Sequence, residues 1–249
     1  MSVKGVIMAG GVGTRFRPLT NYFQKCMIPI GDLEKPILEY IVKLYRYHEI
    51  RDLILLVGYK YLQIQNYFDQ GERFGVRLQY VIDQPDRKGS ANALLNAYNE
   101  EAITENDTLI IYYGDIVSNI NLNDMLKTHK ETDALATVAL ATGFNVNVGT
   151  AEVKDKWIES FIEKPRLNTP VSIGIIILEG KVLHQMMELY NDGQFESYDL
   201  MGDVVQYLVS KKEKVAAHLT DAFWYDVGSM EKYEKLSNER LSEELGFLL

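Results

Sequence analysis

The chain has 249 residues, of which 47% are hydrophobic and 24% are charged, and its formal net charge is −9. This length suits one large α/β domain or two small ones, and the composition is that of a globular protein with a sizeable core. The negative charge argues against a general nucleic-acid-binding protein, which needs a basic surface, although a few clustered cations can still bind a small anionic substrate. The single cysteine, Cys26, excludes an intrachain disulfide.

Neither the N-terminus nor the apolar runs indicate a membrane or secreted protein. The longest apolar runs, LILLVGY and IGIIIL, are far shorter than the roughly 20 residues that cross a bilayer as a helix. One lysine precedes a short apolar run that enters a glycine-rich loop, with no cleavage pattern of a signal peptide. We therefore expect a cytoplasmic protein without a membrane partner.

In the first half of the chain, apolar runs of strand length alternate with amphipathic segments of helical period. Strands are expected at residues 4–10, 52–58, 76–83 and 107–115, and helices at 36–49, 61–70 and 90–102. Pro36 is expected in the first turn of the first helix, and Ser90 is the expected N-cap of the third. Strands that are apolar on both faces and separated by helices predict an α/β fold with a doubly wound, mostly parallel, Rossmann-like sheet.

The second half is more mixed and predicts a small mixed β lobe beside this sheet. Further strands are expected at 134–141, 171–178 and 214–220, and helices at 181–190, 198–211 and 230–245. The segment 151–165 is typical of a hairpin that turns at Asp155-Lys156. No linker rich in Pro, Ser or Gly separates the two halves, so we expect one domain over residues 1–249.

The first strand is followed directly by the loop MAGGVGTRFRPLT, residues 8–20. Its glycines are Gly10, Gly11 and Gly13, and its arginines are Arg15 and Arg17. A dinucleotide-binding loop needs a third glycine where Phe16 stands, and a P-loop needs a Lys-Ser or Lys-Thr pair, so both interpretations fail. What remains is a bare loop at a strand's carboxyl end, whose N–H groups could approach phosphate oxygens or a base edge while an arginine binds the distal phosphates. A tight turn with solvated arginines is the alternative.

Four motifs, in this order along nearly the whole chain, resemble those of the sugar-1-phosphate nucleotidylyltransferases. They are GGVGTRFRPLT followed by Lys25, then YYGD, FIEKP and WYDVG. The resemblance is to the short form of this family, without a C-terminal β-helix, and implies a glycosyltransferase-A-like fold. It also implies attack of a sugar-1-phosphate on the α-phosphorus of a nucleoside triphosphate, with release of pyrophosphate. Residues 1–115 would then bind the nucleotide, and residues 116–249 would bind the sugar phosphate and include the terminal helix.

The resemblance places the nucleotide site in the first half. The implied positions are Ala9, Gly10, Gly11, Gly13, Thr14 and Arg15 in the loop, and Gln84, Gly89 and Ser90 near the base. Lys25 matches the family's signature lysine near the α-phosphate. A side-chain amide such as that of Gln84 can pair with a base edge, and a helix N-terminus favours anionic or acceptor groups.

Asp115 and Asp226 match the family's two metal-binding aspartates, although each taken alone could be an ordinary turn aspartate. Mg²⁺ prefers oxygen ligands and usually keeps several waters, so two carboxylates suffice. The nucleophile needs no general base, because the second pKa of a phosphate monoester is about 6. We therefore expect packing roles for the four histidines and a catalytic set of Arg15, Lys25, Asp115 and Asp226.

The implied sugar-phosphate site lies in the second half. Lys164 matches the lysine that holds the sugar phosphate, Glu163 the carboxylate on the sugar hydroxyls, and Gly149 a glycine that lets the sugar approach the backbone. Ser172 stands where an asparagine is usual, and Cys26, expected as a small apolar filler, stands where relatives carry glutamine or proline. These departures leave base and sugar open; glucose-1-phosphate or mannose-1-phosphate comes first, with uridylyl, thymidylyl or guanylyl transfer.

Two other functions stay open at this stage. One is a non-catalytic regulatory or scaffold relative, which the retention of all the charged motif residues disfavours. The other is a nucleotidylyltransferase with a non-sugar acceptor such as phosphocholine, which depends on the lobe at 149–177. The terminal helix, with Tyr233, Leu236 and Leu241 on one side, could cover the core or form a contact in a homo-oligomer.

Overall fold

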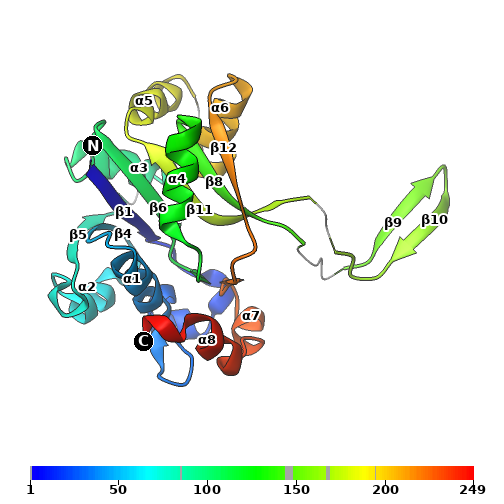
Figure 1. The fold of residues 1–249 in the computed structure, drawn as a ribbon, viewed down its shortest axis with the longest axis horizontal. Helices are drawn as coiled ribbons and strands as arrows, with labels where there is room; N and C mark the ends of the chain where they lie inside the picture. Colours follow the sequence, from blue (N-terminus) through cyan, green and yellow to red (C-terminus); the bar gives the residue numbers. More distant parts are fainter. Residues whose placement is uncertain (1, 85, 144–147, 167–168, 194) are drawn as a thin grey trace.

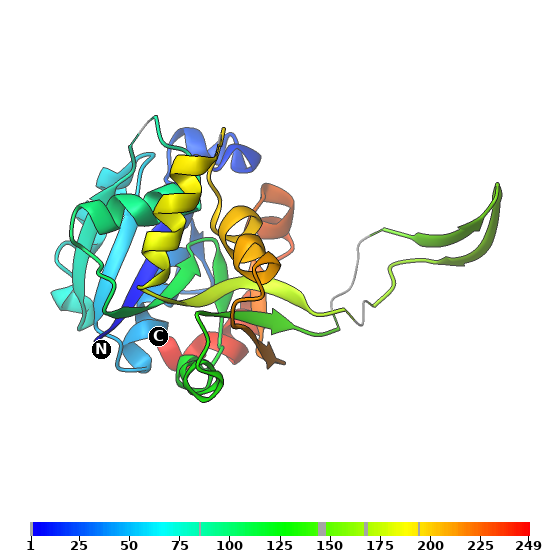
Figure 2. The same cartoon turned by 90° about the horizontal axis from the view of Figure 1, so that it is seen from above.

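A seven-stranded sheet organises the chain (Figures 1 and 2). The computed structural model describes residues 2–84, 86–143, 148–166, 169–193 and 195–249. In sheet order the strands are β5 (Arg77–Ile82), β4 (Asp52–Val57), β1 (Ser2–Ala9), β6 (Asp107–Tyr113), β11 (Val171–Glu179), β8 (Ala136–Ala141) and β12 (Val215–Thr220). All neighbours are parallel except β11, which is antiparallel to β6 and β8. The predicted doubly wound, mostly parallel sheet is confirmed.

Helices cover both faces of this sheet. One face packs against α1 (Ile37–Tyr47), α2 (Tyr61–Phe68), α4 (Leu122–Thr132) and α8 (Asn238–Leu245), and the other against α3 (Ser90–Asn99), α5 (Val182–Asp192) and α6 (Gln206–Ser210). Successive residues of β4 alternate between the two cores: Leu53, Leu55 and Val57 belong to the first, and Ile54 and Leu56 to the second. This burial on both faces explains why the strands read as unbroken apolar runs.

The strand order places a crevice at one edge of the sheet. The chain runs from β1 through β4 to β5, and α3 then returns it to β6 on the opposite side of β1. The order therefore reverses between β1 and β6. Doubly wound sheets bind ligands at the carboxyl ends of the strands beside such a reversal.

The second half adds β8, β11 and β12 to the same sheet and forms the expected hairpin. Its strands are β9 (Thr150–Lys154) and β10 (Trp157–Ile162), and it turns at Asp155-Lys156 as predicted. The hairpin stands away from the body between β8 and β11, and two views show its tip projecting far from the helices (Figures 1 and 2). We call the described residues 148–166 the arm.

Short elements complete the chain. Two further two-stranded antiparallel sheets pair β2 (Pro29–Ile30) with β3 (Lys35–Pro36), and β7 (Ile116–Ser118) with β13 (Trp224–Asp226). Single helical turns are η1 (Thr14–Phe16), η2 (Leu19–Asn21), η3 (Lys25–Met27), η4 (Glu72–Phe74) and η6 (Gly246–Leu248), and η5 (Leu200–Val205) is a π-helix that leads into α6. Among the described residues, no helix combines the length and the hydropathy needed to cross a membrane.

Three local predictions at helix ends were wrong. Pro36 precedes α1 instead of lying in its first turn. Ser90 is the first residue of α3 and Gly89 its N-cap, because the Ser90 side chain is engaged elsewhere. The expected terminal helix is two helices, α7 (Met230–Glu234) and α8, because Ser237 is extended and its hydroxyl accepts the Arg240 N–H as the cap of α8.

The terminal segment covers the core. Leu241 is 1% exposed and packs in the same core as α1, and Tyr233 and Leu236 are partly buried against it. Leu241→Ala should therefore lower the free energy of unfolding by about 2–5 kcal/mol, because it leaves a cavity. Leu249→Ala removes a side chain that is 44% exposed. This variant should change the free energy of unfolding by no more than about 0.5 kcal/mol. Equal, small effects in urea denaturation would show that the segment is not part of the core.

Candidate active site

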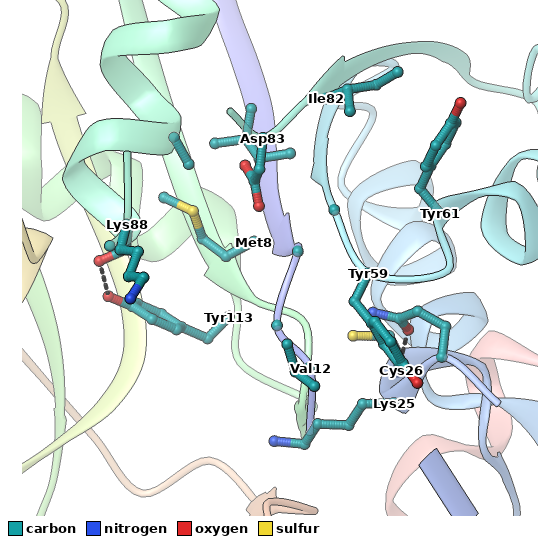
Figure 3. A pocket seen from close by; sticks show the side chains of 18 of the residues that line it. Met8, Val12, Lys25, Cys26, Tyr59, Tyr61, Ile82, Asp83, Lys88 and Tyr113 are labelled. Carbon is teal, nitrogen blue, oxygen red and sulfur yellow. Dashed lines mark hydrogen bonds between the residues drawn. The ribbon is translucent and has the colours of Figure 1, made fainter. Parts of the chain in front are cut away.

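A pocket of about 760 Å³ opens at the carboxyl edge of the sheet (Figure 3). Its lining includes Gly10 and Gly11 after β1, Gly58 and Tyr59 after β4, Asp83 and Gln84 after β5, and Asp115 after β6. In the close view, Tyr59, Tyr61 and Ile82 lie on one side, Lys88 and Tyr113 on the other, and Lys25 at one end (Figure 3). The pocket thus combines an aromatic wall with a cationic end.

The glycine-rich loop after β1 keeps a bare backbone beside the pocket. A Cβ at Gly11 would meet nothing within 4 Å, so packing within the chain does not require glycine there. Gly13 differs, because its φ is +66° and a Cβ would lie 2.9 Å from Thr20 and 3.1 Å from Lys25. Gly13 therefore shapes the loop, whereas Gly11 leaves open space in which a ligand can approach the main chain.

Gln24 fixes the segment that carries Lys25. Its fully buried side chain donates to the Ala9 carbonyl at 2.7 Å and accepts the Cys26 N–H at 2.5 Å. The end of β1 and the η3 turn are thereby joined on either side of the pocket. No motif assigns a role to Gln24, and its one signal in the sequence is a polar residue between an aromatic pair and the signature lysine.

Cys26 is a packing residue, as expected. It lies in the core beside α1, and a Cβ on Gly114 would come within 2.8 Å of its sulfur. Burial, and next the Asp115 carboxylate, raise the pKa of the thiol to about 12, so it stays protonated at neutral pH. Gly114 therefore lets the end of β6 approach η3 closely.

The pairing of β7 with β13 brings Asp115 and Asp226 together from opposite halves of the chain. Asp226 lies opposite Ile116 in the register, and the Val227 N–H donates to the Asp115 carbonyl at 2.8 Å. Gly228 follows without a side chain where a Cβ would collide with the Asp226 carboxylate. The backbones of the two predicted aspartates are thus neighbours; Asp115 lines the pocket, whereas Asp226 is not among the described residues that line it.

Each of these aspartates forms an ion pair with a lysine. Lys25 from η3 binds the Asp115 carboxylate, and Lys232 from α7 binds that of Asp226. Both carboxylates are about a quarter exposed (23% and 29%), so they remain accessible to a ligand. Lys232 was missed by the sequence analysis; Ser229, which caps α7, was the signal that could have placed it near Asp226.

The donor set at this edge fits Mg²⁺. The described residues contain no group of three or more His, Cys, Asp or Glu side chains arranged to hold a metal. A closed protein cage of that kind suits Zn²⁺ or Ca²⁺, whereas Mg²⁺ needs one or two carboxylates and completes its shell with water and phosphate oxygens. Two adjacent, partly exposed aspartates meet that requirement.

Gln84 and Gly89, which the resemblance assigns to the nucleotide site, both line the pocket. The Gln84 amide donates to Asn96 Oδ1 at 2.8 Å, which holds it against α3. Gly89 has a φ of +103°, and a Cβ there would lie within 2.7 Å of the Tyr198 backbone. The fold therefore requires glycine at this position even without a ligand.

Ser90 also lines the pocket, but its hydroxyl already has three partners. It donates to Asp199 at 2.8 Å and accepts from the Leu200 N–H at 2.9 Å and from the Tyr113 hydroxyl at 3.1 Å. These bonds explain why it does not cap α3. Ser90 fixes the wall of the pocket to the segment before α6.

Other predicted residues are not among those that line this pocket. Thr14 and Arg15 are exposed on η1, and Ser172 is exposed on β11. Glu163 and Lys164 are exposed just after β10, at the base of the arm. Gly149 lies opposite them, where a Cβ would come within 2.9 Å of Glu163 Oε2. Of the implied acceptor residues, Gly149, Glu163 and Lys164 therefore lie together at the base of the arm, and Ser172 lies on β11.

The sequence profile of the nucleotidyl transferase family matches residues 4–243. The chain belongs to this family. It is 32% identical, over 98% of its length, to the UTP–glucose-1-phosphate uridylyltransferase of Synechocystis sp., of which it spans 64%. It is 27% identical to the D-glycero-α-D-manno-heptose 1-phosphate guanylyltransferase of Aneurinibacillus thermoaerophilus, with 95% of this chain and 98% of that protein covered. These matches confirm the resemblance seen in the motifs, and the chain spans just under two thirds of the uridylyltransferase.

A solved structure shares the nucleotidyl transferase fold. It is a crystal structure from Bacillus anthracis, described as a candidate glucose-1-phosphate thymidylyltransferase in complex with a sucrose. The TM-score is 0.76 at 22% identity, and the match covers 98% of this chain and 96% of the other. At this identity the likeness supports the fold alone.

Asp83 is a pocket carboxyl that the sequence analysis missed. It follows β5, and a Cβ on Gly58 would lie 2.9 Å from its Oδ2, so it is wedged between strand ends (Figure 3). Its buried Oδ1 has no hydrogen-bond partner among the described residues. Burial raises the pKa of this carboxyl from 3.8 to about 6.

Asp83→Asn should stabilise the protein by about 1–2 kcal/mol at pH 7, a value discounted for partial exposure. Because the pKa of Asp83 is higher in the folded state, the wild type loses stability as pH rises from 3.8 to about 6. The amide has no such titration. In urea denaturation, the variant should therefore have a higher free energy of unfolding than the wild type at pH 7 and the same value near pH 4. An equal difference at both pH values would contradict a titrating Asp83.

Proposed function

We propose that this protein transfers a nucleotidyl group from a nucleoside triphosphate to a sugar-1-phosphate, with Mg²⁺ as cofactor and pyrophosphate as the second product. The observation that carries the proposal is a pocket at the reversal of the sheet that joins an aromatic wall to Lys25 and Asp115, with Asp226 on the strand paired beside Asp115. Membership of the nucleotidyl transferase family, and relatives named for nucleotidyl transfer to sugar phosphates, support it.

The two ends of the pocket suit the two ends of a nucleotide. Tyr59, Tyr61 and Ile82 offer flat and apolar surface for a base and ribose. The bare backbone at Gly11 and the ammonium group of Lys25 suit the phosphates. Arg15, exposed on η1 at the end of the same loop, adds a cation for the distal phosphates.

The histidines fit a reaction without a general base. None of them is among the described residues that line the pocket. Their partners are the Leu122 N–H for His48, Thr137 and Glu179 for His129, Glu105 for His184, and Thr128 for His218. A sugar-1-phosphate needs no deprotonation by the protein, because its second pKa is about 6. Positioning and charge stabilisation would then supply the catalysis.

Asp115 and Asp226 would hold the Mg²⁺ ion. When bound, the ion neutralises developing charge on the phosphate oxygens. Lys25 and Lys232 balance the two carboxylates in the structure described here. In the substrate complex these lysines would turn to phosphate oxygens, so that two highly negative substrates meet fixed positive charge.

A substrate matrix tests this function. Five nucleoside triphosphates are mixed with several sugar-1-phosphates and Mg²⁺, and pyrophosphate release is measured. We expect release with glucose-1-phosphate or mannose-1-phosphate and at least one triphosphate. Pyrophosphate release only with a phosphate such as phosphocholine would favour the non-sugar acceptor. No release with any combination of substrates would favour a non-catalytic scaffold.

Asp115→Asn and Asp226→Asn should each lower kcat/KM at least about 100-fold, because each removes a charge needed in the transition state. Circular dichroism and the unfolding midpoint should stay near those of the wild type. Asp133→Asn is the matched control, since Asp133 is exposed and forms a surface ion pair with Lys214. Normal turnover by both aspartate variants with Mg²⁺ would refute the metal assignment.

A further inference from the structure

Asp83 is a carboxyl group in the pocket to which the proposed function gives no role. It follows β5, and its carboxylate points into the pocket (Figure 3). Its Oδ1 is buried without a hydrogen-bond partner, and no hydrogen bond or ion pair among the described residues reaches Oδ2. Burial raises the pKa of the group to about 6, so it is mostly ionised at pH 7. A partly buried anion without a partner destabilises the fold, and its presence in a pocket indicates a ligand that supplies hydrogen-bond donors.

Bare backbone at two neighbouring strand ends makes room for this carboxylate. A Cβ on Gly10, after β1, would lie 1.8 Å from Asp83 Oδ2, and a Cβ on Gly58, after β4, would lie 2.9 Å from the same atom. A side chain at either position would displace the carboxylate, so the two glycines keep open the slot that it occupies. The torsion about the Cβ–Cγ bond of an aspartate is soft, and a turn about this bond can present both oxygens to a ligand.

The place of Asp83 in the pocket suits the base of a nucleotide and not its phosphates. Lys25 and Asp83 lie at opposite ends of the pocket in the close view, with Tyr59 along the wall between them (Figure 3). Phosphates are attracted by the ammonium group of Lys25 and repelled by a carboxylate. Ile82, which directly precedes Asp83, and Tyr61 provide the apolar and aromatic surface on which a base packs. The donors that reach Asp83 are therefore N–H groups of the base.

Gln84 adds a second acceptor at this end of the pocket. Asn96 Nδ2 donates to the Ile82 carbonyl at 2.9 Å, so Asn96 Oδ1 is the atom that accepts from the Gln84 amide nitrogen at 2.8 Å. These two bonds turn the Gln84 nitrogen toward α3 and leave its oxygen without a partner among the described residues. Two successive residues after β5 thus offer acceptor oxygens to a ligand.

A carboxylate distinguishes the five common bases because it only accepts hydrogen bonds. Guanine presents two adjacent donors, N1–H and the N2 amino group, which match the two oxygens of one carboxylate. Uracil and thymine have N3–H between two carbonyl oxygens, and adenine and cytosine have an amino group beside an acceptor nitrogen. In these four bases, a carboxylate that binds the donor meets a lone pair next to it, which is repulsive.

We propose that Asp83 makes this protein selective for GTP, with its carboxylate accepting hydrogen bonds from N1–H and the N2 amino group of guanine. This choice of base rests on the proposed function, which requires a nucleoside triphosphate as substrate. The carboxyl group that destabilises the free protein gains its missing donors in the complex. Among the bases that the sequence leaves open, Asp83 thus assigns guanylyl transfer.

Binding of triphosphates in the absence of a sugar phosphate tests this assignment. Isothermal titration calorimetry of the full-length protein with Mg²⁺ compares GTP with inosine triphosphate, which lacks the N2 amino group, and with xanthosine triphosphate, which carries an oxygen in its place. The wild type should bind GTP about 10-fold to 100-fold more tightly than either. In Asp83→Asn, the amide presents one acceptor and one donor, which match N1–H and the C2 oxygen of xanthine. This variant should therefore bind xanthosine triphosphate more tightly than GTP.

Asp86→Asn is the matched control. It makes the same change of charge in the same loop, at an exposed position that is not among the described residues lining the pocket. This variant should keep the wild-type order of affinities. A wild type that prefers another common triphosphate to GTP, or an Asp83→Asn variant that still prefers GTP to xanthosine triphosphate, would overturn the guanine selectivity.

Two further outcomes separate the role of Asp83 from the proposed function. If Asp83 bound a ribose hydroxyl group, Asp83→Asn would weaken the binding of every ribonucleotide to the same extent. That result would overturn the guanine selectivity and leave the nucleotide site in place. If the wild type bound none of the five common triphosphates, the proposed function would be refuted together with the selectivity.

Discussion

The pairing of β7 with β13 is the contact on which the candidate site depends. Each strand has only three residues, yet their register, the Val227 N–H bond to Asp115 and the Ser118 hydroxyl bond to the Phe223 carbonyl at 2.7 Å join the two halves of the chain. Without this contact the two carboxylates would belong to separate segments. With it, Asp226 lies beside Asp115 at a pocket that ends in Lys25, which is the arrangement of carboxylates and cations that the proposed function requires.

The sheet could be predicted from the sequence because its strands are buried on both faces. β4 is an example, since its residues alternate between two cores and leave an unbroken apolar run. Helix ends were less predictable, because caps compete with tertiary contacts. Ser90 has the residue type of an N-cap, but its hydroxyl donates to Asp199 and accepts the Leu200 N–H instead. Ser237 was read as part of a helix although it begins a new one.

The position of Asp115 at the carboxyl edge of the sheet could be predicted, because the end of one apolar strand carried the signal. Asp83, Gln24 and Lys232 were missed because each depends on a segment distant in the chain or on a cap that the motif does not contain. The arm shows the same limit. Its turn and alternation predict a hairpin, but a local pattern does not determine how the hairpin is placed relative to the body.

Anomalous diffraction from crystals grown with Mn²⁺ and a non-hydrolysable nucleoside triphosphate tests the central claim most directly. The account predicts a manganese peak within bonding distance of carboxylate oxygens of both Asp115 and Asp226, with the phosphates between the glycine-rich loop and Lys25. A peak that touches neither aspartate, or a triphosphate bound outside the pocket, would contradict it.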